Sequence, residues 1–193
     1  MSFAGSTRNF CGHLRRFARH REGVSAVEFA IVLPFMLLMY VGGVELADGL
    51  SIKFKVTETA RTITDLASQY PSIDAETMSG ILALSSQVVA PYPAASMAMT
   101  LSQVEIPANA TEGTIIWSAS LNGTARTVGA SMAVPTNLQN QSSAVYLMFG
   151  EVTYPYTPGL GYVITGTVNI YESTYFYPRL TNCVSYSGYT CPN

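Results

Sequence analysis

The longest apolar stretch of the sequence runs from residue 24 to residue 44 and contains one charged residue, Glu28. As a helix, this stretch would be about 31 Å long, which matches the hydrocarbon core of a bilayer. The pattern therefore predicts a membrane-spanning helix. A buried core helix and a cleaved secretory signal are the weaker interpretations. So small a chain offers little to cover such a run, and no convincing small-residue cleavage site follows it.

A helical pattern continues beyond this stretch. Apolar residues recur on one helix face up to about residue 67, and Pro71 disfavours helix at the residue before it. We expect one helix over 24–69, with two helices broken at Gly42-Gly43 or Gly49 as the alternative. Pro34 removes a backbone donor inside the helix and predicts a kink there.

The rest of the chain predicts a second helix and several strands. Asp74 is a suitable N-cap for a short helix over 74–89, and alternating apolar residues predict strands around 97–101 and 115–121. Asn122-Gly123 predicts a tight hairpin into 124–128. Two longer strands are expected over 144–154 and 162–177. The predicted fold class is α+β: a long N-terminal transmembrane helix that continues into a stalk and packs on an antiparallel β-sheet head of four or five strands.

Charge divides the chain into two parts. Residues 1–22 carry five arginines and one acid, whereas residues 23–193 carry five basic and eleven acidic residues. By the positive-inside rule, the N-terminus is expected in the cytoplasm and the head outside. Apolar residues make up 48% of the chain, which excludes intrinsic disorder, and a net charge of −2 argues against a nucleic-acid partner.

Glu28 is unusual because a carboxylate inside hydrocarbon is costly unless it is paired or stays near the wet interface. It is the fifth residue after Gly23 and is followed by the aromatic Phe29. This arrangement resembles the processing site of type IV prepilins. The resemblance implies that a prepilin peptidase cuts between Gly23 and Val24. It also implies that Glu28 and Phe29 dock the subunit, with the carboxylate pairing with the new α-amino group of a neighbouring subunit.

A narrower resemblance covers a longer stretch. Residues 21–34 and 43–46 resemble TadE-like pseudopilins of the tight-adherence (Tad/Flp) pilus, and residues 154–158 and 177–180 resemble them more weakly. The resemblance implies a minor pilin-like subunit for pilus assembly and cell adhesion. Its implied partners are the bilayer, the prepilin peptidase, the major Flp pilin, other minor pilin-like subunits and the inner-membrane assembly platform. The alternative is an uncleaved, membrane-anchored assembly factor of the same system.

The expected organisation follows from the motif and the charge. Residues 1–23 form a cleaved cytoplasmic leader, 24–47 the transmembrane helix, 48–70 its extramembrane continuation and 71–193 the extracytoplasmic head. The implied location is the bacterial inner membrane, crossed once, with the head in the periplasm or carried into the extracellular pilus.

The remaining candidate chemistry is sparse. Cys183 and Cys191 lie on the predicted outer side, where a disulfide between them is expected if that compartment is oxidising. Cys11, His13 and His20 match no zinc-ligand spacing. The sequence contains no recognised catalytic or phosphate-binding motif, so no enzyme activity, cofactor or metal is expected. The tyrosines that crowd the last 40 residues suit either an interface or an ordinary half-packed sheet.

Overall fold

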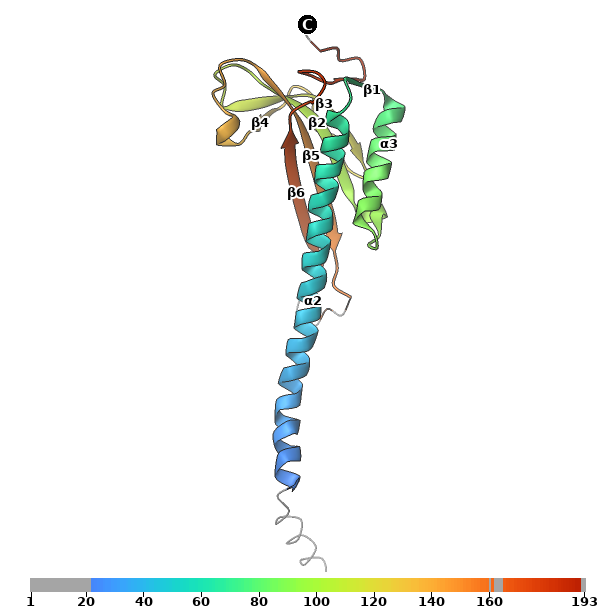
Figure 1. Cartoon of the computed structure of the whole chain (residues 1–193), viewed down its shortest axis with the longest axis vertical. Coiled ribbons are helices and arrows are strands. Elements are labelled where there is room, and N and C mark those ends of the chain that lie inside the picture. The colour runs from blue at the N-terminus through green and yellow to red at the C-terminus, as the bar shows by residue number, and fades with distance from the viewer. Residues whose placement is uncertain (1–21, 160, 162–164, 192–193) are drawn as a thin grey trace, which may run out of the picture.

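The computed structural model describes residues 22–159, 161 and 165–191, and its main feature is one long helix, α2 (Glu22–Ser68) (Figure 1). The helix is continuous through Gly42-Gly43 and Gly49, so the prediction of a single helix is confirmed and the broken alternative is wrong. Its upper half buries the predicted face completely. The residues of that face are Ile52, Val56, Ala60, Ile63 and Ala67.

The head is built on a five-stranded antiparallel sheet with strand order β4-β3-β2-β5-β6. The α+β fold class is therefore confirmed. The strands are β2 (Ala98–Ile106), β3 (Glu112–Leu121), β4 (Ser131–Ala133), β5 (Val145–Tyr156) and β6 (Val168–Phe176). The strand expected over 162–177 begins at Val168, and residues 162–164 of that prediction lie outside the described residues.

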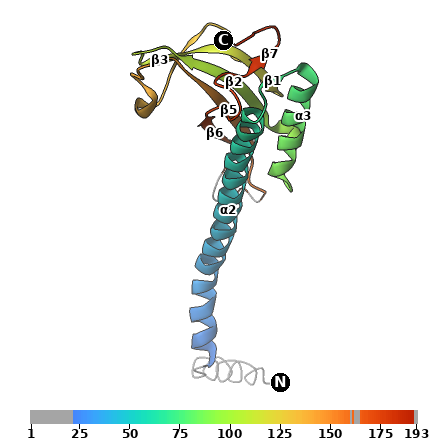
Figure 2. The ribbon, with the colours of Figure 1, turned by 45° about the horizontal axis from the view of Figure 1, so that its top comes forward.

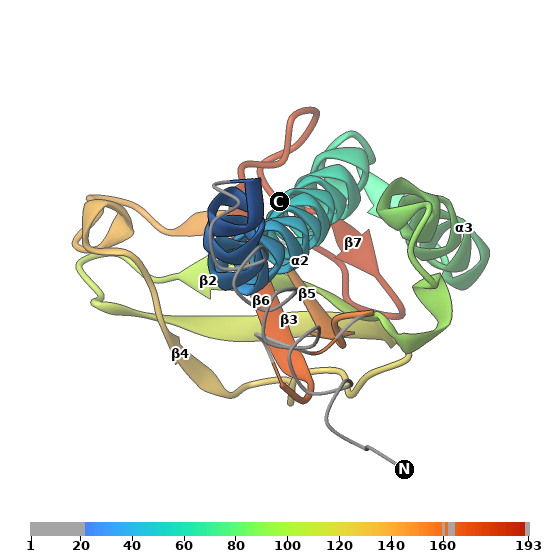
Figure 3. The ribbon, with the colours of Figure 1, turned by 90° about the horizontal axis from the view of Figure 1, so that it is seen from below.

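Two helices cover one face of the sheet. Seen from below, α2 and α3 (Ala75–Ser86) lie on the same side of the sheet (Figure 3). Asp74 caps α3 as expected, because its Oδ1 accepts a hydrogen bond of 2.7 Å from the Thr77 amide. The same bond lowers the pKa of Asp74. Among the described residues, short 3₁₀ turns lie at Gln87–Val89, Ala94–Ser96 and Thr136–Leu138.

The α2 helix crosses the sheet at a glycine. A Cβ added to Gly150 would collide with Thr64 Oγ1 and would lie 3.1 Å from the Ala60 carbonyl oxygen. Thr64 is fully buried, and its hydroxyl donates a 2.7 Å hydrogen bond to Ala60 O. Only a residue without a side chain fits between β5 and α2 at this point, so Gly150 sets the closest approach of helix and sheet.

The predicted hairpin at Asn122-Gly123 is wrong. Asn122 does turn the chain, with φ of 55°, but its side-chain amide donates to Met97 O, and no strand follows over 124–128. The segment instead crosses the face of the sheet away from the helices. The guanidinium of Arg126 reaches Glu151 on β5 there, at 2.5 and 2.7 Å. The strand that pairs with β3 forms only later, as β4.

That crossing segment covers a second apolar cluster on the far face. The cluster joins Val134 of this segment to side chains of β2, β3 and β5. The strand residues are Val104, Ile106, Ile115, Leu147 and Phe149. Both faces of the sheet are therefore covered, one by helices and the other by the 122–143 segment.

A small parallel sheet, which the sequence did not predict, ties the C-terminal segment to the end of α2. β1 (Ser72–Ile73) pairs with β7 (Ser185–Tyr186) beside α3 (Figure 2). The Trp117 indole N–H donates a 2.9 Å hydrogen bond to Val184 O, and its ring lies 5.0 Å from that of Tyr186. The segment is thus held against the helix-covered face of the sheet.

Candidate functional site

The lower part of α2 is exposed on every face. All side chains from residue 23 to residue 40 are exposed, although most are large and apolar. An 18-residue window of this helix has a mean hydropathy of 2.1, and none of it is buried. The 18 residues rise about 27 Å, close to the thickness of a bilayer's hydrocarbon core. By length and composition, this is the one helix of the described residues that could span a membrane.

The predicted processing and docking residues all lie on this exposed part of α2. Gly23, Val24, Glu28 and Phe29 are exposed, and a Cβ added to Gly23 would meet nothing within 4 Å. Among the described residues, the ion pairs do not include Glu28. The head therefore constrains none of these four residues. Their roles in cleavage and docking stay predictions.

Two further predictions on this part of the chain remain untested. Pro34 lies inside α2, which continues on both sides of it, and a functional kink there stays a prediction. The basic leader, with Cys11, His13 and His20, lies outside the described residues, apart from its last two positions.

The head meets α2 at Glu45, a residue that sequence reasoning did not single out. Its exposed fraction is only 2% although it lies one turn above exposed helix. Tyr156 packs nearby, with its Cε1 3.8 Å from the position of a Gly49 Cβ. Burial raises the pKa of Tyr156, and the charges of Asp48 and Glu45 add to the rise. At this foot the head begins to cover α2, at a position within the predicted 24–47 segment.

Tyrosines gather at this foot. Tyr92, Tyr154 and Tyr156 line an open hollow together with Asp48, and the Tyr92 hydroxyl lies 3.5 Å from Asp48 O. Tyrosine is enriched where a protein leaves the bilayer, because its ring suits the apolar side and its hydroxyl the wet side. The arrangement is consistent with a membrane surface just below the head.

At the opposite end of the head, the expected disulfide joins Cys183 and Cys191. The side-chain amide of Gln103 on β2 binds this loop through two hydrogen bonds. Its Nε2 donates to Cys183 Sγ and its Oε1 accepts from the Val184 amide, both at 2.9 Å. Gln103 is fully buried, so both ends of its amide need these partners. The disulfide and the amide together fix the C-terminal segment on the sheet.

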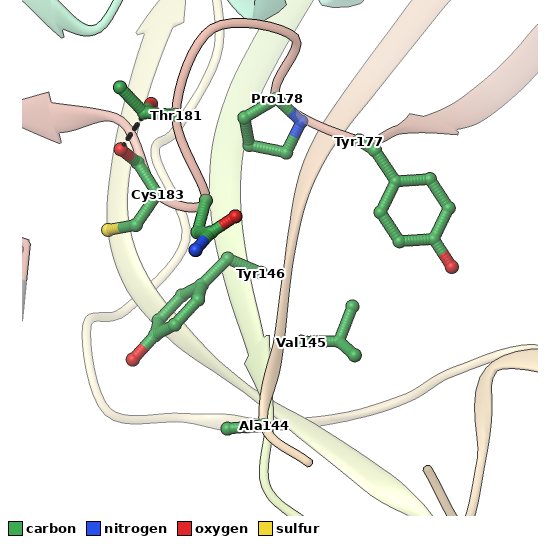
Figure 4. A pocket seen from close by; sticks show the side chains of 8 residues that line it. Ala144, Val145, Tyr146, Tyr177, Pro178, Thr181 and Cys183 are labelled. Carbon is green, nitrogen blue, oxygen red and sulfur yellow. Dashed lines mark hydrogen bonds between the residues drawn. The ribbon is translucent and has the colours of Figure 1, made fainter. Parts of the chain in front are cut away.

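The disulfide borders an open hollow of about 470 Å³ (Figure 4). Tyr146 and Tyr177 line it, and the Thr181 hydroxyl donates a 2.7 Å hydrogen bond to Cys183 O at its rim. The Tyr146 hydroxyl donates to Glu105 Oε1 at 3.1 Å. Burial, helped by that carboxylate, raises the pKa of Tyr146 to about 12. The hydroxyl therefore stays protonated at neutral pH and is a weaker acid than an ordinary tyrosine.

A charged cluster on the far face of the sheet holds the crossing segment in place. Glu151 accepts two hydrogen bonds from Arg126 and one of 2.7 Å from the Tyr171 hydroxyl. The hydrogen bonds from Arg126 to Glu151 raise the pKa of the guanidinium. Arg126 also lies 5.3 Å above the centre of the Phe149 ring. Each group in the cluster has a partner, which suits a clamp better than a reactive site. No group of three or more metal-ligating side chains occurs within the described part of the chain.

Comparison with known proteins gives a match on α2 and none on the head. The family model of TadE-like proteins matches residues 23–64. The match covers the exposed part of α2 and most of its packed part, and it supports the TadE-like resemblance on the residues that carried it. It associates this segment with the tight-adherence pilus system, whose TadE-like members have structural rather than catalytic roles. No curated protein and no solved structure matches the chain significantly.

Proposed function

We propose that the chain is a minor pilin-like subunit for assembly of a tight-adherence pilus, cut after Gly23 by a prepilin peptidase. The observation that carries the proposal is the exposed apolar segment at residues 23–40, which lies inside the TadE-like match. In this proposal the segment sits in the inner membrane, and the head is on the periplasmic side. The chain then has a structural role.

The peptide bond after Gly23 is not covered by the head. It lies at the start of α2, about 22 residues below the buried Glu45, and no part of the head approaches Gly23. Cutting there removes the basic leader and creates an α-amino group at Val24. That cation is four residues, about 6 Å along the helix axis, from the Glu28 carboxylate. The pair forms best between neighbouring staggered helices, because a carboxylate in hydrocarbon needs a cation.

The direct test is the N-terminal sequence and intact mass of the membrane-bound protein from cells with and without the peptidase. The proposal expects a start at Val24 only when the peptidase is present. A start upstream of Gly23 in both strains would instead identify an uncleaved membrane-anchored assembly factor.

Gly23→Ala has a matched control in Gly43→Ala. Neither position has an atom within 4 Å of an added Cβ, so both variants should fold and insert equally well. Only Gly23→Ala should accumulate as uncut precursor, which immunoblotting of membranes measures. Equal processing of both variants would contradict recognition of Gly23.

Glu28→Leu tests the docking role. Both Glu28 and its neighbour Val27 are exposed, so Glu28→Leu and the control Val27→Leu should leave the head intact. Glu28→Leu should insert normally but reduce piliation, counted by electron microscopy, whereas Val27→Leu should not. Normal pili from Glu28→Leu would remove Glu28 from assembly.

A further inference from the structure

Above the membrane segment, α2 carries an apolar stripe that the head leaves uncovered. Leu46, Leu50 and Phe54 have exposed fractions of 58%, 48% and 68%. They recur every four residues and so share one side of the helix. Ile52 and Val56, which pack on the sheet, lie about 200° around the helix from Leu50 and Phe54. The stripe therefore lies on the side of α2 opposite the residues that pack on the sheet.

A membrane segment that starts at Val24 ends below this stripe. A hydrocarbon core of about 30 Å accommodates roughly 20 helical residues, which from Val24 reach about residue 43. The stripe begins at Leu46, level with the buried Glu45 and the foot of the head. Above the stripe, Arg179 covers the C-terminal end of α2. Its backbone amide donates a 2.8 Å hydrogen bond to Ser68 O, and the Arg179 guanidinium pairs with Asp65. The uncovered stretch is thus bounded at both ends.

Leu50 and Phe54 have the spacing of neighbouring d and a positions in a short parallel helix pair, with Leu46 beside them at position g. With Leu50 at position d and Phe54 at position a, Gly43 is also at d and Ala47 at a. Between residues 45 and 59 the head buries Glu45, Ile52, Val56 and Thr59, which occupy positions f and c, away from the partner helix. From Ala60 upward the head also buries positions g, d and a, so the seam ends below Ala60. Two such helices can therefore meet while their heads lie on opposite outer sides.

The flanking charges match a second copy of the same chain. In this register Lys53 is at position g and Glu58 at the following e, the pair that faces across a parallel two-stranded coiled coil. Within one chain their ion pairs are long: Lys53 lies 3.9 Å from Glu172, and Glu58 lies 3.8 Å from Arg61. Their side chains are 60% exposed, so both remain available to a neighbour.

We propose that two copies of this chain pair side by side through the Leu46–Leu50–Phe54 stripe of α2, with Lys53 of each copy facing Glu58 of the other. The parallel orientation rests on the proposed function, because two copies anchored by the same helix share one direction in the membrane. The pairing is outside the bilayer and does not require Glu28.

Cysteine cross-linking in intact membranes tests the pairing. The background is the full chain with Cys11→Ser, in which Cys183 and Cys191 are bonded to each other. Leu50→Cys and Phe54→Cys should form a disulfide-linked species of twice the monomer mass on mild oxidation. Asp48→Cys, exposed but at position b, is the matched control and should yield about tenfold less dimer.

Exchanging the charges at Lys53 and Glu58 tests whether the partner helix belongs to a second copy of the same chain. Lys53→Glu or Glu58→Lys, added to Leu50→Cys, should each lower the dimer yield about three- to tenfold, because each places like charges opposite each other. The double exchange should return the yield to within about twofold of Leu50→Cys alone. Equal yields at positions 48 and 50, a product of another mass, or a double exchange as weak as the single ones would overturn the proposal.

The pairing and the processing can fail separately. Running the cross-linking in strains with and without the peptidase reports the pairing at position 50, while N-terminal sequencing of the same membranes reports the cut after Gly23. Dimers without a Val24 start would retain the pairing and refute processing. A Val24 start in samples that give no dimer at position 50 or 54 would do the reverse.

Discussion

The two halves of α2 are both regular helix, yet different surroundings hold them. Residues 23–40 are exposed all round, whereas the upper half buries a face that includes Ile52, Val56 and Ile63 under the sheet. A helix that is apolar on all sides needs an apolar medium, and a helix with one apolar stripe needs a packed partner. The same backbone geometry therefore provides a segment suited to a membrane below Glu45 and the spine of a folded head above it.

The largest expected difference between the two halves of α2 comes from truncating one isoleucine in each half. Ile63→Ala should destabilise the head by about 2–5 kcal/mol, because it removes a fully buried side chain between α2 and the sheet. Ile31→Ala makes the same chemical change in the exposed half and should leave head stability unchanged. Thermal unfolding in detergent, followed by the fluorescence of the sole tryptophan, Trp117, measures both. Equal destabilisation by the two variants would mean that the lower half is packed as well.

Two glycine substitutions test how closely α2 packs on β5. Gly150→Ala should cost about 1–3 kcal/mol, because its Cβ would collide with Thr64 Oγ1 and the overpacked helix must move. Gly80→Ala, in α3, meets nothing within 4 Å and should stabilise the head by about 0.5–1 kcal/mol through helix propensity. Opposite shifts in Tm are the expected result. A neutral Gly150→Ala would show that helix and sheet are less closely packed there.

The smallest expected effect lies at high pH in the head. The pKa of Tyr146 is raised to about 12 from an ordinary value of 10. The neutral hydroxyl is therefore favoured in the folded state, so its contribution to stability is complete below about pH 10 and disappears as pH rises through about 12. Tyr146→Phe should flatten this part of the alkaline unfolding curve. Titration of tyrosine absorbance in both proteins checks it, and an unchanged curve would place the late-titrating hydroxyl elsewhere.

Local patterns were good predictors wherever one property decided the outcome. The apolar run, the spacing of buried residues in α2 and the cap at Asp74 all follow from nearest neighbours on a helix. The disulfide between Cys183 and Cys191 followed from the compartment expected for the C-terminus. The prediction at Asn122-Gly123 was wrong because Arg126 has its partner, Glu151, two strands away on the sheet.

By itself, the sequence determined a long continuous helix, its division into an apolar lower half and an amphipathic upper half, and an α+β head. These features depend on periodicity, length and composition. The tertiary structure alone decided that Glu45 is buried, that Gly150 admits α2 and that the 122–143 segment crosses the far face. It also decided that β1 pairs with β7. Each of these depends on groups distant in the chain meeting in space, where packing and paired charges outweigh local preference.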